Sequence, residues 1–139
     1  MNYTEKAKRL LAEGGFTCVV CGDDFLYTSH ERGVKPLLVP LEEGKSFEGF
    51  SAADKVVGKA AACLYVLLKI KEVHAGIISC RALDVFEKYG VKITFDELVE
   101  AIENRTKTGL CPMESAVWEL ENAEDAPDAI RATLKKLAE

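Results

Sequence analysis

The strongest constraint on the fold is the alternation of strand and helix signals between residues 73 and 93. Residues 73–78 form an apolar run of strand length, residues 81–89 have helical spacing and end at Gly90, and residues 91–93 again suit a strand. A strand, a helix and a strand in this order form a βαβ unit with a right-handed crossover and parallel strands. The sequence therefore predicts an α/β fold.

A second constraint is the apolar segment that precedes this unit. Ser51 and Asp54 are spaced as a variant of the capping box, and they predict a helix over residues 52–70. Apolar residues occupy almost every face of that helix, so we expect it to be buried nearly all round. Gly58 and the alanines allow close approach to a sheet or another helix.

The N-terminal third predicts a helix followed by a hairpin. Residues 3–13 place Ala7 and the two leucines Leu10 and Leu11 on one helical face. Two short strands follow at 16–21 and 25–29, joined by a Gly-Asp-Asp turn at 22–24.

Residues 30–50 contain several glycines and two prolines and predict a loop with a short extended piece at 37–39. Thr94 and Glu97 have the spacing of a capping box and predict a helix ending near Arg105, followed by a loop.

The C-terminal region predicts two further helices. One begins at Cys111-Pro112 and the other near Asp125 and Pro127. Together the elements predict a three-layer α/β/α sandwich with a mixed sheet, in one domain over residues 1–139.

Composition excludes several classes of protein. With 48% hydrophobic and 29% charged residues and a net charge of −5, the chain has the balance of a soluble globular protein. The acidic excess lies in residues 113–139 and no basic stripe is present, which argues against extended nucleic-acid binding while leaving room for one bound nucleotide. The longest apolar run, residues 60–68, is far shorter than the roughly 20 residues that span a bilayer. We expect no membrane partner and a cytoplasmic location.

The five cysteines predict thiols rather than disulfides, because a domain of this length needs no covalent crosslinks. Cys18 and Cys21 form a C-x-x-C pair inside a strand-like run, where residues three apart point to opposite faces. We interpret them as buried structural residues, together with Cys63.

Two motifs carry a resemblance to a known family. Asp54-Lys55-Val56-Val57-Gly58-Lys59-Ala60-Ala61-Ala62 and Gly109-Leu110-Cys111-Pro112-Met113-Glu114-Ser115 resemble the recurring motifs of a bacterial and archaeal family of unknown function placed in the cytidine-deaminase-like superfamily. The resemblance covers most of the chain and implies that superfamily's fold and a pocket. It implies no particular activity.

The residues that a zinc deaminase requires are not where the resemblance would put them. Such enzymes need a His or Cys with a Glu two residues later at the start of the buried helix, then Pro-Cys-x-x-Cys at the next helix. No His, Cys or Glu lies between residues 51 and 62, and Cys80 is followed three residues later by Leu83. We therefore expect no catalytic zinc, no other metal and no cofactor.

The candidate ligand-binding residues come from both motifs and from the helix start near residue 80. Asp54 either caps its helix or faces a pocket, and Lys59 must pair, lose its charge or extend to solvent because its helix is otherwise apolar. Cys111 would be the N-cap of its helix, where amides and the helix dipole activate a thiol or bind an anion. The full set is Asp54, Lys55, Lys59, Cys80, Arg81, Cys111 and Glu114.

Three functions remain open at this point. The first is binding of a nucleotide-like or other anionic small molecule. The second is a metal-independent enzyme with Cys111 as nucleophile or Lys59 as base. The third is a structural protein that dimerises through helix 52–70, and a homo-oligomer is expected. His74 is expected to be a satisfied core histidine.

Overall fold

The computed structural model describes residues 2–31, 33–104 and 106–138. In these residues five strands form one mixed sheet in the order β2-β1-β3-β4-β5. The strands are β1 (Cys18–Cys21), β2 (Leu26–Ser29), β3 (Ser51–Val57), β4 (Glu72–Ser79) and β5 (Lys92–Val99). β1 is antiparallel to both β2 and β3, whereas β3, β4 and β5 are parallel.

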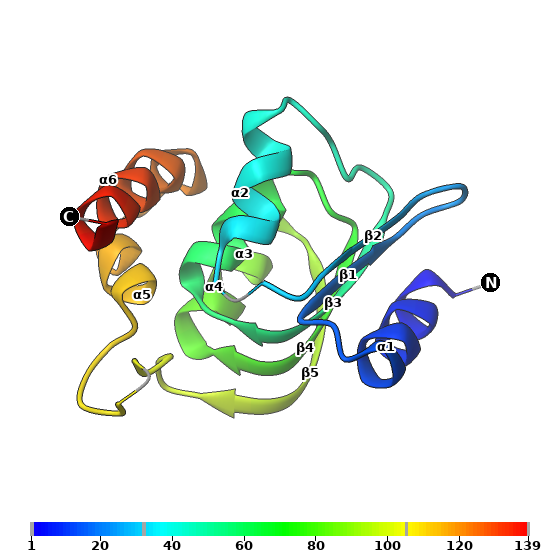
Figure 1. Ribbon diagram of the computed structural model, residues 1–139, viewed down its shortest axis with the longest axis horizontal. Helices are drawn as coiled ribbons and strands as arrows, with labels where there is room; N and C mark the ends of the chain where they lie inside the picture. The colour runs from blue at the N-terminus through cyan, green and yellow to red at the C-terminus, as the bar shows by residue number, and fades with distance from the viewer. Residues whose placement is uncertain (1, 32, 105, 139) are drawn as a thin grey trace.

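Helices cover both faces of the sheet (Figure 1). One face packs against α1 (Tyr3–Gly14), and the other carries α2 (Lys35–Glu42), α3 (Lys59–Leu67) and α4 (Cys80–Tyr89). Beyond α3, on the side away from the sheet, lie α5 (Pro112–Val117), a short 3-10 turn (Ala123–Asp125) and α6 (Ala126–Ala138). The predicted α/β fold with layers on both faces of a mixed sheet is confirmed.

The predicted βαβ unit is also confirmed. β4, α4 and β5 follow the expected order with parallel strands, and Gly90 ends α4 in the left-handed conformation at φ 73°. The N-terminal helix and hairpin lie where the sequence placed them, and so do the helices that begin after Cys111 and near Asp125.

The predicted helix over 52–70 is wrong in its first third. Residues 51–57 form β3, the central strand, and Gly58 separates it from α3. Ala52 and Ala53 are completely buried because helices pack on both faces of this strand. A strand buried on both faces lacks polar alternation, so its sequence resembled a buried helix.

The predicted loop over 30–50 contains the helix α2. Pro36 lies in its first turn, where proline is tolerated. Pro40 has no N–H to donate to the carbonyl of Pro36, and the hydroxyl of Tyr27 donates to that oxygen instead, at 2.8 Å. A hydrogen bond from a neighbouring strand thus compensates for the proline inside the helix.

The helix predicted from Thr94 is also wrong, because residues 92–99 form β5 beside β4. Arg105, the predicted helix end, lies outside the described residues. In the part of the chain that the structure describes, no helix is both long and apolar enough to cross a bilayer.

Candidate functional site

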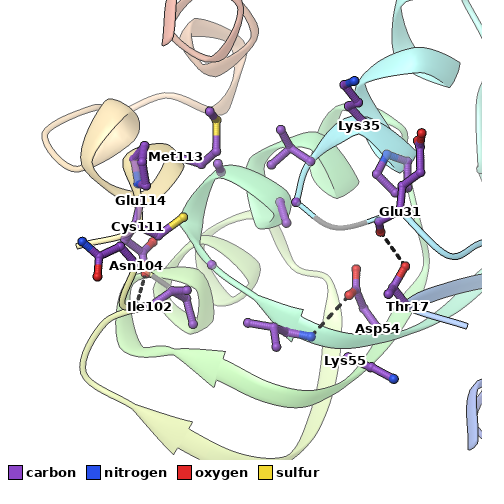
Figure 2. Close-up of a pocket in the computed structure, with 18 of the residues that line it drawn as sticks. Thr17, Glu31, Lys35, Asp54, Lys55, Ile102, Asn104, Cys111, Met113 and Glu114 are labelled. Carbon is purple, nitrogen blue, oxygen red and sulfur yellow. Dashed lines mark hydrogen bonds between the residues drawn. The ribbon is translucent and has the colours of Figure 1, made fainter. Parts of the chain in front are cut away.

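A cavity of about 930 Å³ lies beside the C-terminal half of β3 and the start of α3. Strand residues and the start of α2 form one side, and residues 102–104, 106 and 111–114 form the other (Figure 2). Leu134 and Leu137 of α6 complete the wall. The lining is mostly apolar with a few polar groups, which is the usual character of a small-molecule site.

The structure brings four of the seven predicted ligand-binding residues to this cavity. Asp54, Lys55, Cys111 and Glu114 line it, although they come from β3 and from the α5 region sixty residues further along the chain. In Figure 2, Asp54 and Cys111 lie on opposite sides of the cavity, and the amino group of Lys55 points away from it. The remaining predicted residues, Lys59, Cys80 and Arg81, are outside the set that lines the cavity.

Asp54 is not in the first turn of a helix, as the sequence predicted, but in β3. Tyr65 of α3 donates its hydroxyl to Asp54 Oδ2 at 2.8 Å, and the backbone N–H of Val56 donates to Oδ1 at 3.4 Å. Burial raises the pKa of Asp54 from 3.8 to about 7, against the opposing effect of these hydrogen bonds. This carboxyl can therefore change its protonation state near neutral pH.

A buried thiol continues the hydrogen-bonded group behind Asp54. Cys18 Sγ lies 3.3 Å from the hydroxyl of Tyr65. Burial raises the pKa of the Cys18 thiol and of the Tyr65 phenol, and the nearby Asp54 raises both further. Both groups are therefore neutral near pH 7, which fits the structural role expected for Cys18.

Glu114 has its carboxylate in contact with the backbone of two segments. Its side chain is buried, with 1% of its surface exposed. Oε1 accepts the backbone N–H of Lys59 at 2.7 Å, and Oε2 accepts the N–H of Ile102 at 2.8 Å. Because Gly58 has no side chain with which to cap α3, Glu114 of α5 caps that helix by direct contact and joins it to the segment at residue 102.

Of the alternatives expected for Lys59, the structure shows pairing, but the partners of its ammonium group are backbone carbonyls and not a carboxylate such as Asp54 or Glu114. Its Nζ donates to the carbonyl oxygens of Trp118 at 3.1 Å and Leu120 at 2.5 Å. Arg81 donates to the same Trp118 carbonyl, and its guanidinium lies 3.6 Å from the centre of the Trp118 ring. Both cations therefore bind the carboxyl end of α5, where they satisfy backbone carbonyls and the helix dipole.

Replacement of Lys59 by Met is expected to lower stability without lowering ligand affinity. Methionine keeps the apolar stem but leaves two carbonyls without their donor, while relief of the buried charge offsets part of the loss. The free energy of unfolding should fall by about 1–2 kcal/mol, measured by urea denaturation. The control is Lys55→Met, which replaces an exposed lysine of β3 and should change the free energy of unfolding little. A loss of affinity with unchanged stability would contradict this assignment.

The two cysteines that were predicted to be pocket residues differ in position. Cys111 precedes the first residue of α5, is half-buried, and directs its sulfur toward the cavity (Figure 2). Cys80 is exposed at the first turn of α4. Cys18, Cys21 and Cys63 are buried free thiols, as expected.

His74 is buried on β4. Its Nδ1 lies 2.8 Å from Thr94 Oγ1 and its Nε2 lies 3.4 Å from Asp96 Oδ1, which is the satisfied environment predicted for it. Among the described residues, no group of three His, Cys, Asp or Glu side chains is arranged to hold a metal ion.

Sequence reasoning missed Tyr65 and several polar lining residues. Tyr65 supplies a phenol within an otherwise apolar stretch of α3. A single polar group in such a stretch was the sequence signal that could have indicated a buried hydrogen-bond partner. Its partner could be identified only once residues 51–57 were recognised as a strand. The missed lining residues include Thr17, Glu31, Lys35 and Asn104.

The sequence over residues 6–134 matches the family described as TM1506, a domain of unknown function (DUF1893). The chain belongs to this family. A crystal structure of a DUF1893 family protein from Thermotoga maritima is similar, with 27% sequence identity and a TM-score of 0.85 over 97% of this chain and 90% of that one. No curated protein matches the chain.

A second solved structure has much lower similarity. It is a diaminohydroxyphosphoribosylaminopyrimidine deaminase/5-amino-6-(5-phosphoribosylamino)uracil reductase from Thermotoga maritima, with 15% identity and a TM-score of 0.42. The match covers 83% of this chain and 40% of the other, so this chain corresponds to less than half of that protein.

Proposed function

We propose that this DUF1893 protein binds a small molecule, nucleotide-like in size and polarity, in the cavity beside β3. The observation that carries the proposal is a cavity of about 930 Å³ with the Asp54 carboxyl in its wall. Ligand sites commonly have volumes of about 300–1,000 Å³ and combine apolar walls with a few oriented polar groups. Val34, Ala61 and Met113 supply apolar surface here, and Thr17 and Asn104 supply polar groups.

The residues proposed for an anionic part of the ligand differ from those expected from the sequence. Lys59 and Arg81 bind the backbone carbonyl of Trp118, so their charges are already used. Lys35, the first residue of α2, lines the cavity and offers an ammonium group in their place. A nucleotide-like ligand would place its anionic group toward Lys35 and its heterocycle toward Asp54.

We also propose a relation to cytidine deaminases without zinc chemistry. The observed helices and strands change which residues correspond to the zinc-ligand positions of those enzymes. The helix after the hairpin is α2, and the helix after the next strand is α3. Residues 34–36 at the start of α2 are Val-Lys-Pro, and residues 58–61 at the start of α3 are Gly-Lys-Ala-Ala. Neither start contains the His-x-Glu or Pro-Cys-x-x-Cys pattern that zinc deaminases use, which supports the part of the proposal that leaves zinc chemistry out.

The dimer hypothesis receives less support from the structure than ligand binding does. Residues 59–65 of α3 are buried within the chain itself, and Val66 and Leu67 at its end are only half-buried. A metal-independent enzyme with Cys111 as nucleophile stays the second candidate, because this thiol faces the cavity.

Ligand protection of Cys111 tests the proposed function. A panel of nucleosides, nucleotides and sugar phosphates is first screened by thermal shift, and native protein is then alkylated with iodoacetamide with and without each hit. Without ligand, mass spectrometry should show modification at Cys80 and Cys111 but not at the buried cysteines. A hit that occupies the cavity should slow alkylation of Cys111 and leave Cys80 unchanged.

Cys80 is thus the internal control for changes in reagent reactivity. Equal protection of both cysteines, or no thermal shift with any compound, would contradict small-molecule binding in this cavity. An alkylation rate for Cys111 that is no faster than that of the exposed Cys80 would argue against the activated nucleophile.

A further inference from the structure

We infer that Asp54 binds the hydrogen-bond-donating, positively charged end of the ligand, an amine or amidine-type nitrogen, and that Tyr65 positions the carboxyl for this contact. The inference rests on the small-molecule binding proposed above. It assigns a chemical class to one end of the ligand and a role to two residues.

The first argument is the direction of the hydrogen bonds on Asp54. Tyr65 Oη and Val56 N are both donors, one to each carboxyl oxygen. These two donors offset part of the cost of burial for the ionised carboxylate, and its oxygens can each accept a further hydrogen bond from a ligand. A ligand with a hydrogen-bond donor would occupy the remaining acceptor position of the carboxylate. A ligand that only accepts would require a protonated carboxyl, although both neighbours of Asp54 are placed to donate to it.

The second argument is the charge around Asp54. Cys18 on β1 and Tyr65 on α3 lie behind the carboxyl, and both are neutral near pH 7 because burial raises the pKa of each. Glu31, which precedes α2, adds another carboxylate to the same side of the cavity. Lys35 begins α2, and Lys55 on β3 points its amino group away from the cavity. Among the residues that the structure describes, no lysine or arginine side chain forms an ion pair with Asp54, so a cationic group on the ligand would compensate its desolvated charge directly.

The apolar lining gives the rest of such a ligand a place to pack. Ala60, Ala61, Ile102 and Met113 lie along the same cavity. A flat hydrophobic body carrying a donor group at one end would bury its body against these residues and direct the donor to Asp54.

Three shape-matched probes test the assignment: benzamidine, benzamide and benzoate. They share a phenyl ring and carry a cationic donor pair, a neutral amide and an anion, respectively. Each is titrated into the protein at millimolar concentration and followed by two-dimensional amide NMR. We expect benzamidine to bind most tightly, with shifts at residues 54–58 and around Cys111.

Variants of Asp54 and Tyr65 then separate recognition from positioning. Asp54→Asn keeps the shape and should weaken benzamidine binding by about 10- to 100-fold, the range for loss of a charge-assisted hydrogen bond. The same substitution should weaken the binding of benzamide much less. In the wild type, benzamidine affinity should rise between about pH 6 and pH 8 as the carboxyl ionises, and Asp54→Asn should abolish that rise. Tyr65→Phe removes a donor that stabilises the carboxylate, so the midpoint of the rise should move to higher pH.

The outcomes distinguish this inference from the proposed function. Benzoate binding more tightly than benzamidine, or equal benzamidine affinity in the wild type and Asp54→Asn, would overturn the role of Asp54 while leaving small-molecule binding intact. Absence of benzamidine binding would also overturn it. The proposed function is tested separately, because it fails if the nucleoside, nucleotide and sugar phosphate panel gives no thermal shift or if its hits protect Cys80 and Cys111 equally.

Discussion

Replacement of Glu114 by Ala should lower the free energy of unfolding by about 3 kcal/mol, because it removes the acceptor for two buried backbone donors at once. The N–H groups of Lys59 and Ile102 each donate to one oxygen of this carboxylate, whose side chain is excluded from solvent. Alanine provides no substitute acceptor, and it removes a negative charge from the N-terminus of α3. Urea denaturation followed by circular dichroism would measure the change.

Two further variants isolate the cause. Glu114→Gln retains the shape and one acceptor oxygen but turns an amide group toward the second donor, so it should lose about half as much stability. Glu124→Ala removes an exposed glutamate from the 3-10 turn and should lie within about 0.5 kcal/mol of the wild type. Native-state hydrogen exchange should accelerate selectively at the amides of Lys59 and Ile102 in Glu114→Ala. Unchanged exchange at these two amides would contradict the capping role.

The C-terminal part of the candidate site was predictable because local signals fix it. Cys111-Pro112 sets a helix start through the fixed φ of proline, and Glu114 in the first turn is a common position for an N-terminal capping group. The sequence could not show that Glu114 caps α3 rather than its own helix. That contact joins residues 55 positions apart and exists only after α5 packs on α3.

The strand β3 was missed for a reason that also hid the role of Asp54. Sequence periodicity detects a strand when one face is polar, but β3 is the central strand and its N-terminal residues Ser51, Ala52 and Ala53 are buried. Tertiary packing on both faces selects small apolar residues, which a helix also accepts. With residues 51–57 predicted as a helix, Asp54 is placed in a first helical turn, as a cap or a pocket residue, and its contact with Tyr65 cannot be recognised.

The reverse happened at Thr94 and Glu97, where a capping-box spacing occurs inside a strand. Ile93, Thr94 and Phe95 are β-branched or aromatic and pair with β4, and this pairing outweighs the local helix signal.

The lysine of the apolar helix was more informative. Pairing was one of the alternatives expected for Lys59, but its partners are the backbone carbonyls of Trp118 and Leu120, which no sequence pattern encodes.

Asp54→Asn is expected to stabilise the protein at neutral pH, an effect that few substitutions in a binding site would have. Burial raises the pKa of Asp54 from 3.8 to about 7 in the folded state. Between these values the unfolded chain has released its proton while the folded protein still holds it. Ionisation therefore favours the unfolded state, and the contribution of this residue to stability falls as the pH rises from about 4 to about 7, then stays constant.

The expected magnitude follows from the same difference. A pKa difference of about three corresponds to at most about 4 kcal/mol, and because the side chain is partly reached by solvent through the cavity, we expect about 2 kcal/mol. Denaturation at a series of pH values should show no difference between the wild type and Asp54→Asn near pH 4 and an increasing advantage for the variant up to about pH 7. Asp84→Asn, an exposed aspartate of α4, should show no such trend.

A gain in stability combined with a loss of affinity would identify Asp54 as a residue retained for binding rather than for folding. An aspartate that served only to hold Tyr65 would leave ligand affinity unaffected in Asp54→Asn, because asparagine can accept the same hydroxyl. A wild-type stability that rises between pH 4 and pH 7 relative to Asp54→Asn would show that the folded state favours the ionised carboxylate without a ligand. In that case the ligand would not be needed to compensate its charge, and the argument for a cationic donor at this end of the cavity would fail.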